Sequence, residues 1–318
     1  MPTKHHPHRG SMQFWPRARS SKHCARVKSW NRSKDNKVEG FLGYKVGMTH
    51  VLFKEKNSKS PRKDMEVFCP CTVIECPPMK VYSIRFYKNT GDGRKVVSEI
   101  FSKKVDKELS RKIQPSKKDN KDPEDFDYMR LVVYTQPKLL GIGKKKPDMI
   151  EVAVSDDVEY AKSFLDKEIK ISDVHKEGTF VDIHGVTTGK GFAGTVKRYG
   201  VKIMSHKAEK TKRGIGSMGA WTTKKVTYTV AQPGKMGYHL RTEYNKLCIK
   251  LGDKPEEINP KGGFVRYGLV KNDYILLEGS VIGPRKRPIT ITSAIRTKIK
   301  AQPKEITYVS LESKQRWN

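Results

Sequence analysis

The sequence predicts a mainly β protein, in which a β-barrel is interrupted by an α+β subdomain and carries long basic extensions. Short β-prone runs, apolar and punctuated by glycine, occur in two blocks far apart in the sequence, which is typical of the strands of a small barrel. Other stretches are rich in Lys, Arg and Gly and contain too few apolar residues to bury a core of their own. The 318 residues are enough for one or two domains with a substantial core.

The first block of β-prone runs begins with FLGYKVGMTHVLF at residues 41–53 and continues at 65–75 and 81–87. Within it, Gly43 and Gly47 predict bends or bulges. The second block consists of runs at 179–186, 244–251 and 264–281. We therefore assign residues 37–87 to the first part of the barrel, residues 178–188 and 244–300 to its remainder, and residues 301–318 to a C-terminal segment.

Residues 88–177 differ in composition and are expected to form the inserted α+β subdomain. A four-residue spacing of apolar side chains predicts an amphipathic helix through Phe101, Val105, Leu109 and Ile113. Strands are expected at 131–134 and 149–154. A second helix, capped by Ser155 or Asp156, is expected to carry a stripe of Val158, Ala161, Phe164, Leu165 and Ile169. Acidic residues concentrate between 151 and 177, so we expect this subdomain to face solvent rather than phosphate.

The charge of the chain indicates a polyanionic partner. Its 65 Lys and Arg outnumber 34 Asp and Glu, which gives a formal net charge of +31. Such a charge repels itself in a compact protein and is offset by binding phosphates. A membrane is not expected, because the chain has no 18-residue apolar run, basic amphipathic helix or lipidation signal. Residues 1–10 lack the apolar region of a secretory signal.

The cysteines predict neither disulfides nor a metal site. Their number, five, is odd, and a long chain with few cysteines is typical of a reducing compartment. Cys69, Cys71 and Cys76 do not have the spacing of a zinc ribbon or finger, and the residues between them resemble a buried strand. We expect these cysteines to pack as small apolar groups, with no metal and no cofactor.

Residues 1–36 form the basic N-terminal extension. Asp35 is the only acid in this range, and Trp15 and Trp30 lie among arginines without helical or strand periodicity. Aromatic rings among basic residues are suited to stacking on RNA bases. The alternative is an N-terminal strand whose aromatic residues belong to the core.

A central extension at 189–243 is rich in both glycine and basic residues. Acids within it are limited to Glu209 and Glu243. Glycine allows the backbone to approach phosphates closely, and the basic side chains supply the opposite charge. The least charged part is GIGSMGAW at 214–221, which predicts a loop carried between two basic arms.

The same extension contains a G-x-G-x-x-G pattern at Gly189, Gly191 and Gly194. A dinucleotide site requires the third glycine to enter a helix and a second strand to follow with an acidic residue. Neither an apolar helical stripe nor such a strand follows here, so we do not expect a Rossmann site. A P-loop is excluded by the spacing of Gly185 from Gly189 and Lys190.

Several blocks of sequence together resemble one family. They are VDIHGVTTGKGFAGTVKRY at 181–199, KRG at 212–214, GAW at 219–221, VAQPGKMGYH at 230–239 with Arg241 and Thr242, GSMQFWPR at 10–17 and GFLGYKVGMT at 40–49. Together these blocks cover the whole length of the chain, and along the sequence they occur in the right order for the family that they resemble. The sequence resembles the universal L3 (uL3) family of large-subunit ribosomal proteins, in its archaeal form.

The resemblance implies a translation-protein-type β-barrel with an inserted subdomain and extensions buried in 23S-type rRNA. It implies a cytoplasmic, non-enzymatic protein that nucleates assembly of the large subunit and contacts neighbouring ribosomal proteins. The central extension is then a finger directed towards the peptidyl transferase centre, where it shapes aminoacyl-tRNA entry and indirectly affects tRNA and elongation factors. By match of motif, its tip is Gly219, Ala220 and Trp221. Eukaryotic members carry a methylatable finger histidine, and none lies between His206 and His239.

The extensions, with a basic turn at 283–288, supply the residues expected to bind rRNA. These are Arg9, Trp15, Arg17, Arg19, Arg26, Trp30, Lys190, Lys197, Arg198, Lys207, Lys212, Arg213, Lys224, Lys225, Lys235, His239, Arg241, Arg285, Lys286 and Arg287.

Two other functions are weighed against rRNA binding. An RNA-acting enzyme would need a general base, and the Asp182 and His184 pair, with His175 nearby, is the candidate. A general DNA- or chromatin-binding protein would carry similar charge but bind duplex DNA as well as folded rRNA.

Overall fold

The computed structural model describes residues 9–31, 37–56, 60–114, 123, 125–297 and 303–313. Both ends of the expected N-terminal extension (1–8 and 32–36), the last residues of the expected barrel (298–300) and parts of the expected C-terminal segment (301–302 and 314–318) lie outside the described residues. The chain divides into two compact units. Residues 22–185 with 241–318 form what we call the barrel unit, and residues 1–21 with 186–240 form the basic unit.

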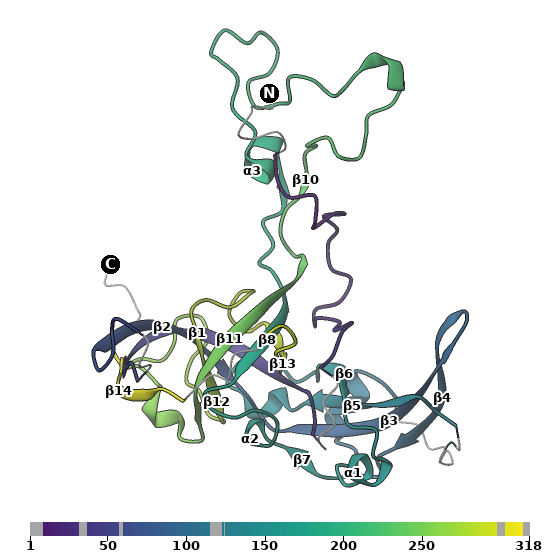
Figure 1. Cartoon of the computed structure of the whole chain (residues 1–318), viewed down its shortest axis with the longest axis vertical. Coiled ribbons are helices and arrows are strands. Elements are labelled where there is room, and N and C mark those ends of the chain that lie inside the picture. Colours follow the sequence, from purple (N-terminus) through teal and green to yellow (C-terminus); the bar gives the residue numbers. More distant parts are fainter. Residues whose placement is uncertain are drawn as a thin grey trace. The chain divides into compact units, whose positions relative to one another are not determined.

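A closed sheet forms the centre of the barrel unit, as the β-prone runs predicted. Its strands are β1 (Gly40–Lys54), β2 (Glu66–Glu75), β8 (Phe180–Val186), β11 (Leu240–Gly252), β12 (Tyr274–Glu278) and β13 (Pro288–Ser293). The hydrogen-bonded order is β13-β8-β11-β12-β2-β1, and β13 also pairs with β1, so the ring closes (Figure 1). An additional strand, β14 (Glu305–Val309), pairs with β1. The mainly β fold is therefore confirmed.

Neighbouring residues of the barrel strands are buried on opposite faces. In β12, Tyr274 and Leu276 belong to one apolar cluster, whereas Ile275 belongs to another that also contains Ile84 and Leu131 of a second sheet. Successive side chains of a strand point to opposite sides, so a strand that is covered on both sides requires an unbroken apolar run. Each such side chain stabilises the fold by about 1.5–3 kcal/mol relative to an exposed one.

The two glycines of the first strand have different roles. The register of β1 against β2 shifts between Lys45 and Gly47, which confirms the bulge predicted there. Gly43 does not mark a bend, because it pairs in regular register with Ile289. A β-carbon at Gly43 would lie 2.6 Å from Cγ2 of Ile74, so glycine is required here for close packing.

The second sheet begins earlier than expected. Its strands are β3 (Met79–Thr90), β4 (Gly93–Phe101), β5 (Tyr128–Thr135) and β6 (Met149–Ala153), in the order β4-β3-β5-β6, with β7 (Glu168–Ile169) paired to β3. Residues 79–87, which we assigned to the barrel, therefore belong to the other sheet, and the boundary at 87 is wrong. Strands of both sheets have the same apolar pattern, and only their pairing partners distinguish them.

Some of the acidic charge of this subdomain is internally paired. Arg85 contacts Glu99 at 3.0 Å and Glu151 at 2.7 Å, and Arg130 lies 3.4 Å from the same Glu151. Burial opposes ionisation of Glu151, but its hydrogen bonds with Tyr87 and Arg85 and these two positive charges outweigh it and lower its pKa. Part of the negative charge of this subdomain is thus neutralised by its own arginines.

The amphipathic helix expected through residues 101–113 is wrong. Phe101 ends β4, and a short 3-10 helix, η1 (Lys107–Arg111), contains Leu109 as its buried residue. Leu109 and Phe101 pack instead in a small cluster with Tyr82 and Tyr134. Phe101, Val105 and Leu109, spaced four residues apart, come from a strand end, a loop and a short 3-10 helix that meet the same cluster, so no continuous helix is needed.

The second expected helix is shorter than its apolar stripe. Helix α1 (Val158–Lys162) is capped by Asp157, whose carboxylate accepts hydrogen bonds from the backbone N–H of Glu159 (3.0 Å) and of Tyr160 (3.3 Å). The cap lies one residue beyond the expected Asp156, and Ile169 belongs to β7. The remaining short elements of the barrel unit are α2 (Ile171–Val174), η2 (Pro137–Leu139) and η4 (Pro255–Glu257).

The basic unit contains little regular structure. Strands β9 (Phe192–Ala193) and β10 (Gly234–Lys235) pair with each other, α3 spans Thr195–Tyr199, and η3 spans Trp221–Thr223. A helix directly after Gly194 was not expected, but it is a single turn that ends at Gly200, which has a φ of 69°. None of the described helices is long and apolar enough to cross a membrane.

Candidate nucleic-acid interface

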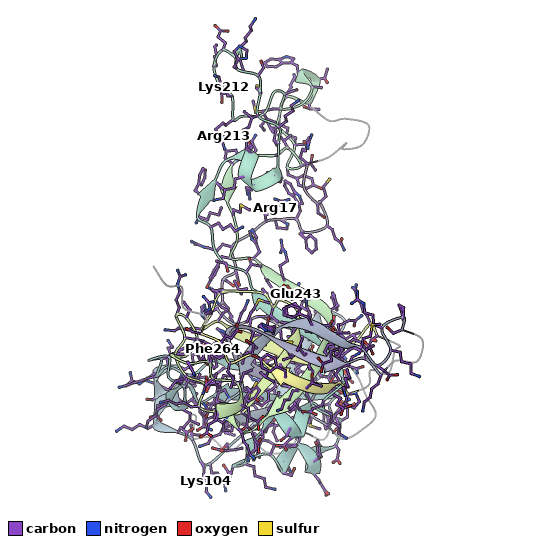
Figure 2. All side chains as sticks on the ribbon, turned by 90° about the vertical axis from the view of Figure 1, so that its left-hand side faces the viewer. Arg17, Lys104, Lys212, Arg213, Glu243 and Phe264 are labelled. Atoms are coloured by element: carbon purple, nitrogen blue, oxygen red, sulfur yellow. The ribbon has the colours of Figure 1, made fainter. Side chains whose placement is uncertain are left out.

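The basic unit carries many positive charges and almost no negative ones. Between residues 186 and 240, Glu209 is the only acidic residue. Lys212 and Arg213 follow one another along the loop after α3 (Figure 2). The exposed side chains include those of Arg19, Lys190, Lys197, Lys207, Lys212, Arg213, Lys224, Lys225 and Lys235, and Arg9 is partly buried. Exposed cations without local carboxylates form a surface suited to a phosphate backbone.

An aromatic and arginine cluster lies within this unit. The Trp15 ring lies 6.0 Å from the Tyr199 ring and meets Tyr228 edge-on at 5.7 Å. The guanidinium of Arg17 lies 4.1 Å from the centre of the Tyr199 ring, and its Nη1 donates a hydrogen bond of 2.8 Å to the carbonyl of Arg198. The structure thus brings Trp15, Arg17 and Arg198, which are far apart in sequence, into one cluster.

Arg198 joins the outgoing and returning arms of the central extension. Its Nη1 donates to the carbonyl of Gln232 at 2.8 Å, and its Nε donates to that of Lys235 at 3.2 Å. The backbone pairs of β9 and β10 link the same two arms. Arg198 therefore has a structural role in addition to its charge, which sequence inspection did not reveal.

His239 is committed to the protein rather than to a phosphate. Its Nε2 lies 3.1 Å from the backbone nitrogen of Gly237, which can only donate, so Nε2 is the acceptor. The ring hydrogen must then be on Nδ1, which donates to the carbonyl of Ala18 at 2.8 Å. Nδ1 thus ties the N-terminal segment to the central extension, and Nε2 holds the local turn at Gly237, while contact of His239 with rRNA stays a prediction.

The two tryptophans of the N-terminal extension have different surroundings. Residues 22–31 belong to the barrel unit, where Trp30 packs against the apolar core. A β-carbon at Gly40 would lie 2.7 Å from Cζ3 of Trp30, so the ring also fills the space that this glycine leaves. Trp30 thus packs as the core-aromatic alternative expects, and its contact with rRNA stays a prediction. Arg26 of the same segment is exposed.

The stretch proposed as a tip is open to solvent. Trp221 is 93% exposed and Met218 is 55% exposed, although large apolar side chains are normally buried. Gly219 has a φ of 116°, a conformation that other residues rarely adopt. Ala220 accepts a 2.9 Å hydrogen bond from the hydroxyl of Thr223, which holds the turn that presents the tryptophan.

The basic turn of the barrel unit is held by a lysine beneath it. Lys45 donates from Nζ to the carbonyls of Val281 and Gly283, and its backbone pairs with Lys286 and Arg287. Burial lowers the pKa of Lys45. Arg285 and Lys286 are exposed on this turn, whereas Arg287 and the β11 residue Arg241 are half-buried.

The residues suspected of catalysis have structural partners. Asp182 accepts hydrogen bonds from the backbone N–H of Asn245 (2.8 Å) and of Ile295 (3.1 Å). His184 lies between the hydroxyls of Thr242 and Thr292, at 3.0 and 3.1 Å. His175 is buried, and desolvation lowers its pKa to about 4. Carboxylate and imidazole thus serve separate parts of the fold and do not form a dyad.

The cysteine and glycine motifs also behave as structural features. Cys69 and Cys71 are buried free thiols whose sulfurs lie 3.9 Å apart. Over the described residues, no cluster of three or more His, Cys, Asp or Glu could hold a metal ion. The G-x-G-x-x-G stretch includes a two-residue strand paired antiparallel to β10, which is not the parallel β-α-β geometry of a dinucleotide site.

Comparison with known proteins agrees with the sequence blocks. A family model described as ribosomal protein L3 matches residues 1–126 and 123–316. The chain is 43% identical over 330 residues to the large ribosomal subunit protein uL3 of Methanobrevibacter smithii, with 98% of each chain covered. It is 44% identical over 328 residues to the protein of the same name from Methanocaldococcus jannaschii, with 97% of each covered. On this basis the chain belongs to the ribosomal protein L3 family.

Proposed function

We propose that this chain is a structural, non-enzymatic constituent of the large ribosomal subunit that binds 23S-type rRNA in the cytoplasm. The observation that carries the proposal is the charge of the basic unit. Its lysines and arginines are largely exposed, and residues 186–240 contain a single acidic residue. Its backbone is largely irregular and rich in glycine. Relatives named large ribosomal subunit protein uL3 match nearly the whole chain, and this similarity supports large-subunit rRNA as the partner.

The tip of the central extension is proposed to reach the peptidyl transferase centre and to shape aminoacyl-tRNA entry. No charged residue occurs between Arg213 and Lys224, so the tip itself is uncharged and basic residues lie only on either side of it. Trp221, 93% exposed within it, is suited to stacking or wedging in a crowded RNA environment. In this proposal, tRNA and elongation factors are affected indirectly, through the position of the tip.

The barrel unit is proposed to contact neighbouring ribosomal proteins and to help nucleate subunit assembly. Phe68 is 60% exposed and Tyr308 is 45% exposed, and both rings lie beside that of His50 on the surface of β1, β2 and β14. An exposed aromatic group of this kind is typical of a protein interaction surface. The basic turn with Arg285 and Lys286 gives the same unit a place to bind phosphates.

Binding of the full-length chain to a large-subunit rRNA transcript, compared with duplex DNA of equal length at the same salt, tests the rRNA proposal. We expect tighter binding to rRNA, with affinity falling as salt rises. Replacement of Lys190, Lys197 and Lys235 by Gln removes up to three phosphate contacts. The slope of log affinity against log salt should then decrease in magnitude by about 2–3.

A matched control replaces Lys103, Lys104 and Lys107 by Gln in the subdomain expected to face solvent; Lys104 is labelled in Figure 2. These three side chains are also exposed. The control removes the same charge from a surface that is not expected to contact phosphate, so its salt slope should match that of the wild type. Equal affinity for duplex DNA, or an equal loss in the control, would contradict the proposal and favour a general DNA-binding protein.

A further inference from the structure

The basic unit contains a cleft that the proposed function leaves unassigned. It has a volume of about 510 Å³ and lies between the N-terminal segment, α3 and the returning arm. The side chains that define it include those of Trp15, Arg17, Arg198, Tyr199, Tyr228 and Gln232. Pockets of roughly 300–1,000 Å³ are typical of sites for small organic groups, so the cleft can admit a single nucleoside.

Aromatic rings form much of its wall. Tyr228 meets Trp15 edge-on at 5.7 Å and remains 74% exposed, so most of its surface is open to a ligand. On the other side, Trp15 packs against Tyr199, which is buried and cannot move away. A mostly exposed ring in edge contact with a packed tryptophan offers a surface on which another planar ring can stack.

The charged groups at the cleft are already oriented. Arg17 is held over Tyr199 and donates to the carbonyl of Arg198, and Arg198 donates to Gln232 and Lys235. A guanidinium carries five N–H donors, and over the described residues these hydrogen bonds use one donor of Arg17 and two of Arg198. The remaining donors are suited to base oxygens and nitrogens or to phosphate.

We propose that this cleft binds one unpaired, unstacked base of the large-subunit rRNA, with Tyr228 and Trp15 as the stacking surface and Arg17 and Arg198 as donors. This inference rests on the proposed rRNA-binding function and adds a specific subsite to it. The N-terminal segment and the central extension would form the subsite jointly, since Trp15 and Arg17 come from one and Arg198 and Tyr228 from the other.

Charge favours an RNA base over a protein side chain as the occupant. Two exposed lysines, Lys197 and Lys225, directly adjoin cleft residues in sequence, and a base brings a phosphate on each side of it. Every base has a flat face, whereas an aliphatic side chain would leave the guanidinium donors unused. Stacking on an aromatic side chain changes affinity by about 5- to 150-fold for one base.

Chemical footprinting of the chain's own large-subunit rRNA, bound by the full-length protein, tests the subsite. The reagents are dimethyl sulfate and a carbodiimide, which modify unpaired bases, and hydroxyl radicals, which report on the backbone. Wild type and Tyr228→Phe should protect one or two unpaired bases, and Tyr228→Ala should lose that protection while backbone protection elsewhere persists. Because Tyr228 is mostly exposed, the Ala variant should fold, which circular dichroism checks.

Two results would overturn the subsite. In one, the Ala variant keeps every base protection of the wild type, so that no base depends on the ring. In the other, the Ala variant loses backbone protections throughout the rRNA, which would assign Tyr228 a general folding role. In this experiment, absence of any footprint from the wild-type chain would instead count against the rRNA proposal itself. Tyr308→Ala, which removes an exposed ring from the barrel unit, should leave the base protections unchanged.

Discussion

The guanidinium of Arg17 lies over the ring of Tyr199, 4.1 Å from its centre, and this contact holds two segments that are more than 180 residues apart. One segment is the N-terminal extension, and the other is the helix at the start of the central extension. Two further hydrogen bonds continue the same junction, from Ser20 N–H to the carbonyl of Tyr238 at 2.8 Å and from His239 to Ala18. Residues 9–21 of the expected N-terminal extension and residues 189–240 of the expected central extension therefore belong to one structural unit.

Replacing Arg17 by Gln should loosen this junction. The variant loses the ring contact and the charged hydrogen bond to the Arg198 carbonyl, which together contribute about 2 kcal/mol. Local opening should become about 30-fold more frequent, and hydrogen exchange of the Ser20 amide should accelerate accordingly. Arg19→Gln removes the same charge from an exposed neighbour and serves as control. Unchanged exchange at Ser20 in the Arg17 variant would show that the contact does not hold the segment.

Gly43→Ala should destabilise the barrel unit. Its new β-carbon would lie 2.6 Å from Cγ2 of Ile74 and 3.0 Å from Sγ of Cys76, both in the core. Such overpacking costs about 1–3 kcal/mol, measured as the free energy of unfolding in urea. Gly91→Ala, where no atom lies within 4 Å of the new β-carbon, is the matched control and should change stability little. Equal stabilities for the two variants would refute the close-packing explanation.

Stability should fall as the pH is lowered, partly because of His175. Burial lowers the pKa of this histidine from 6.5 to about 4, so the unfolded chain binds its proton more readily than the folded one. The stabilisation is present above pH 6.5 and is lost as the pH falls towards 4. Between pH 7.5 and pH 5 the loss is about 2 kcal/mol from this residue.

Urea unfolding at both pH values, for wild type and His175→Gln, measures this contribution. His184, whose pKa burial also lowers, remains in both proteins and contributes in the same direction. The variant should therefore retain some pH dependence but less than the wild type. The same difference between pH 7.5 and pH 5 in both proteins would exclude His175 as a source.

Trp221→Ala should affect the ribosome but not the isolated protein. Because the side chain is 93% exposed, the free energy of unfolding should change by less than about 0.5 kcal/mol. In large subunits that contain the variant, we expect slower aminoacyl-tRNA accommodation, measured in a single-turnover peptide-bond assay. Trp221→Phe keeps a stacking ring and should retain most of the rate. Wild-type rates with the Ala variant would contradict a functional tip.

Local sequence patterns predicted some elements of the fold correctly and others wrongly. The bulge at Gly47 and the buried strand through Tyr274–Glu278 follow from residue types that act within their own strand. The helix expected through Leu109 is absent because its apolar residues pack against Tyr82 and Tyr134, which lie elsewhere in the sequence. The sheet boundary at 87 failed for a similar reason, since the partner of β3 is β5.

By itself, the sequence determined the chemistry of this protein. Its charge of +31 and the single acid among the basic residues of 186–240 are properties of composition, which folding does not change. Only the tertiary structure decided which of the similar residues do what. It placed Trp15 in an open aromatic cleft and Trp30 against the core, and it turned His239 and Arg198 towards backbone carbonyls. Those roles depend on partners distant in sequence, whose positions are set by long-range packing and hydrogen bonding.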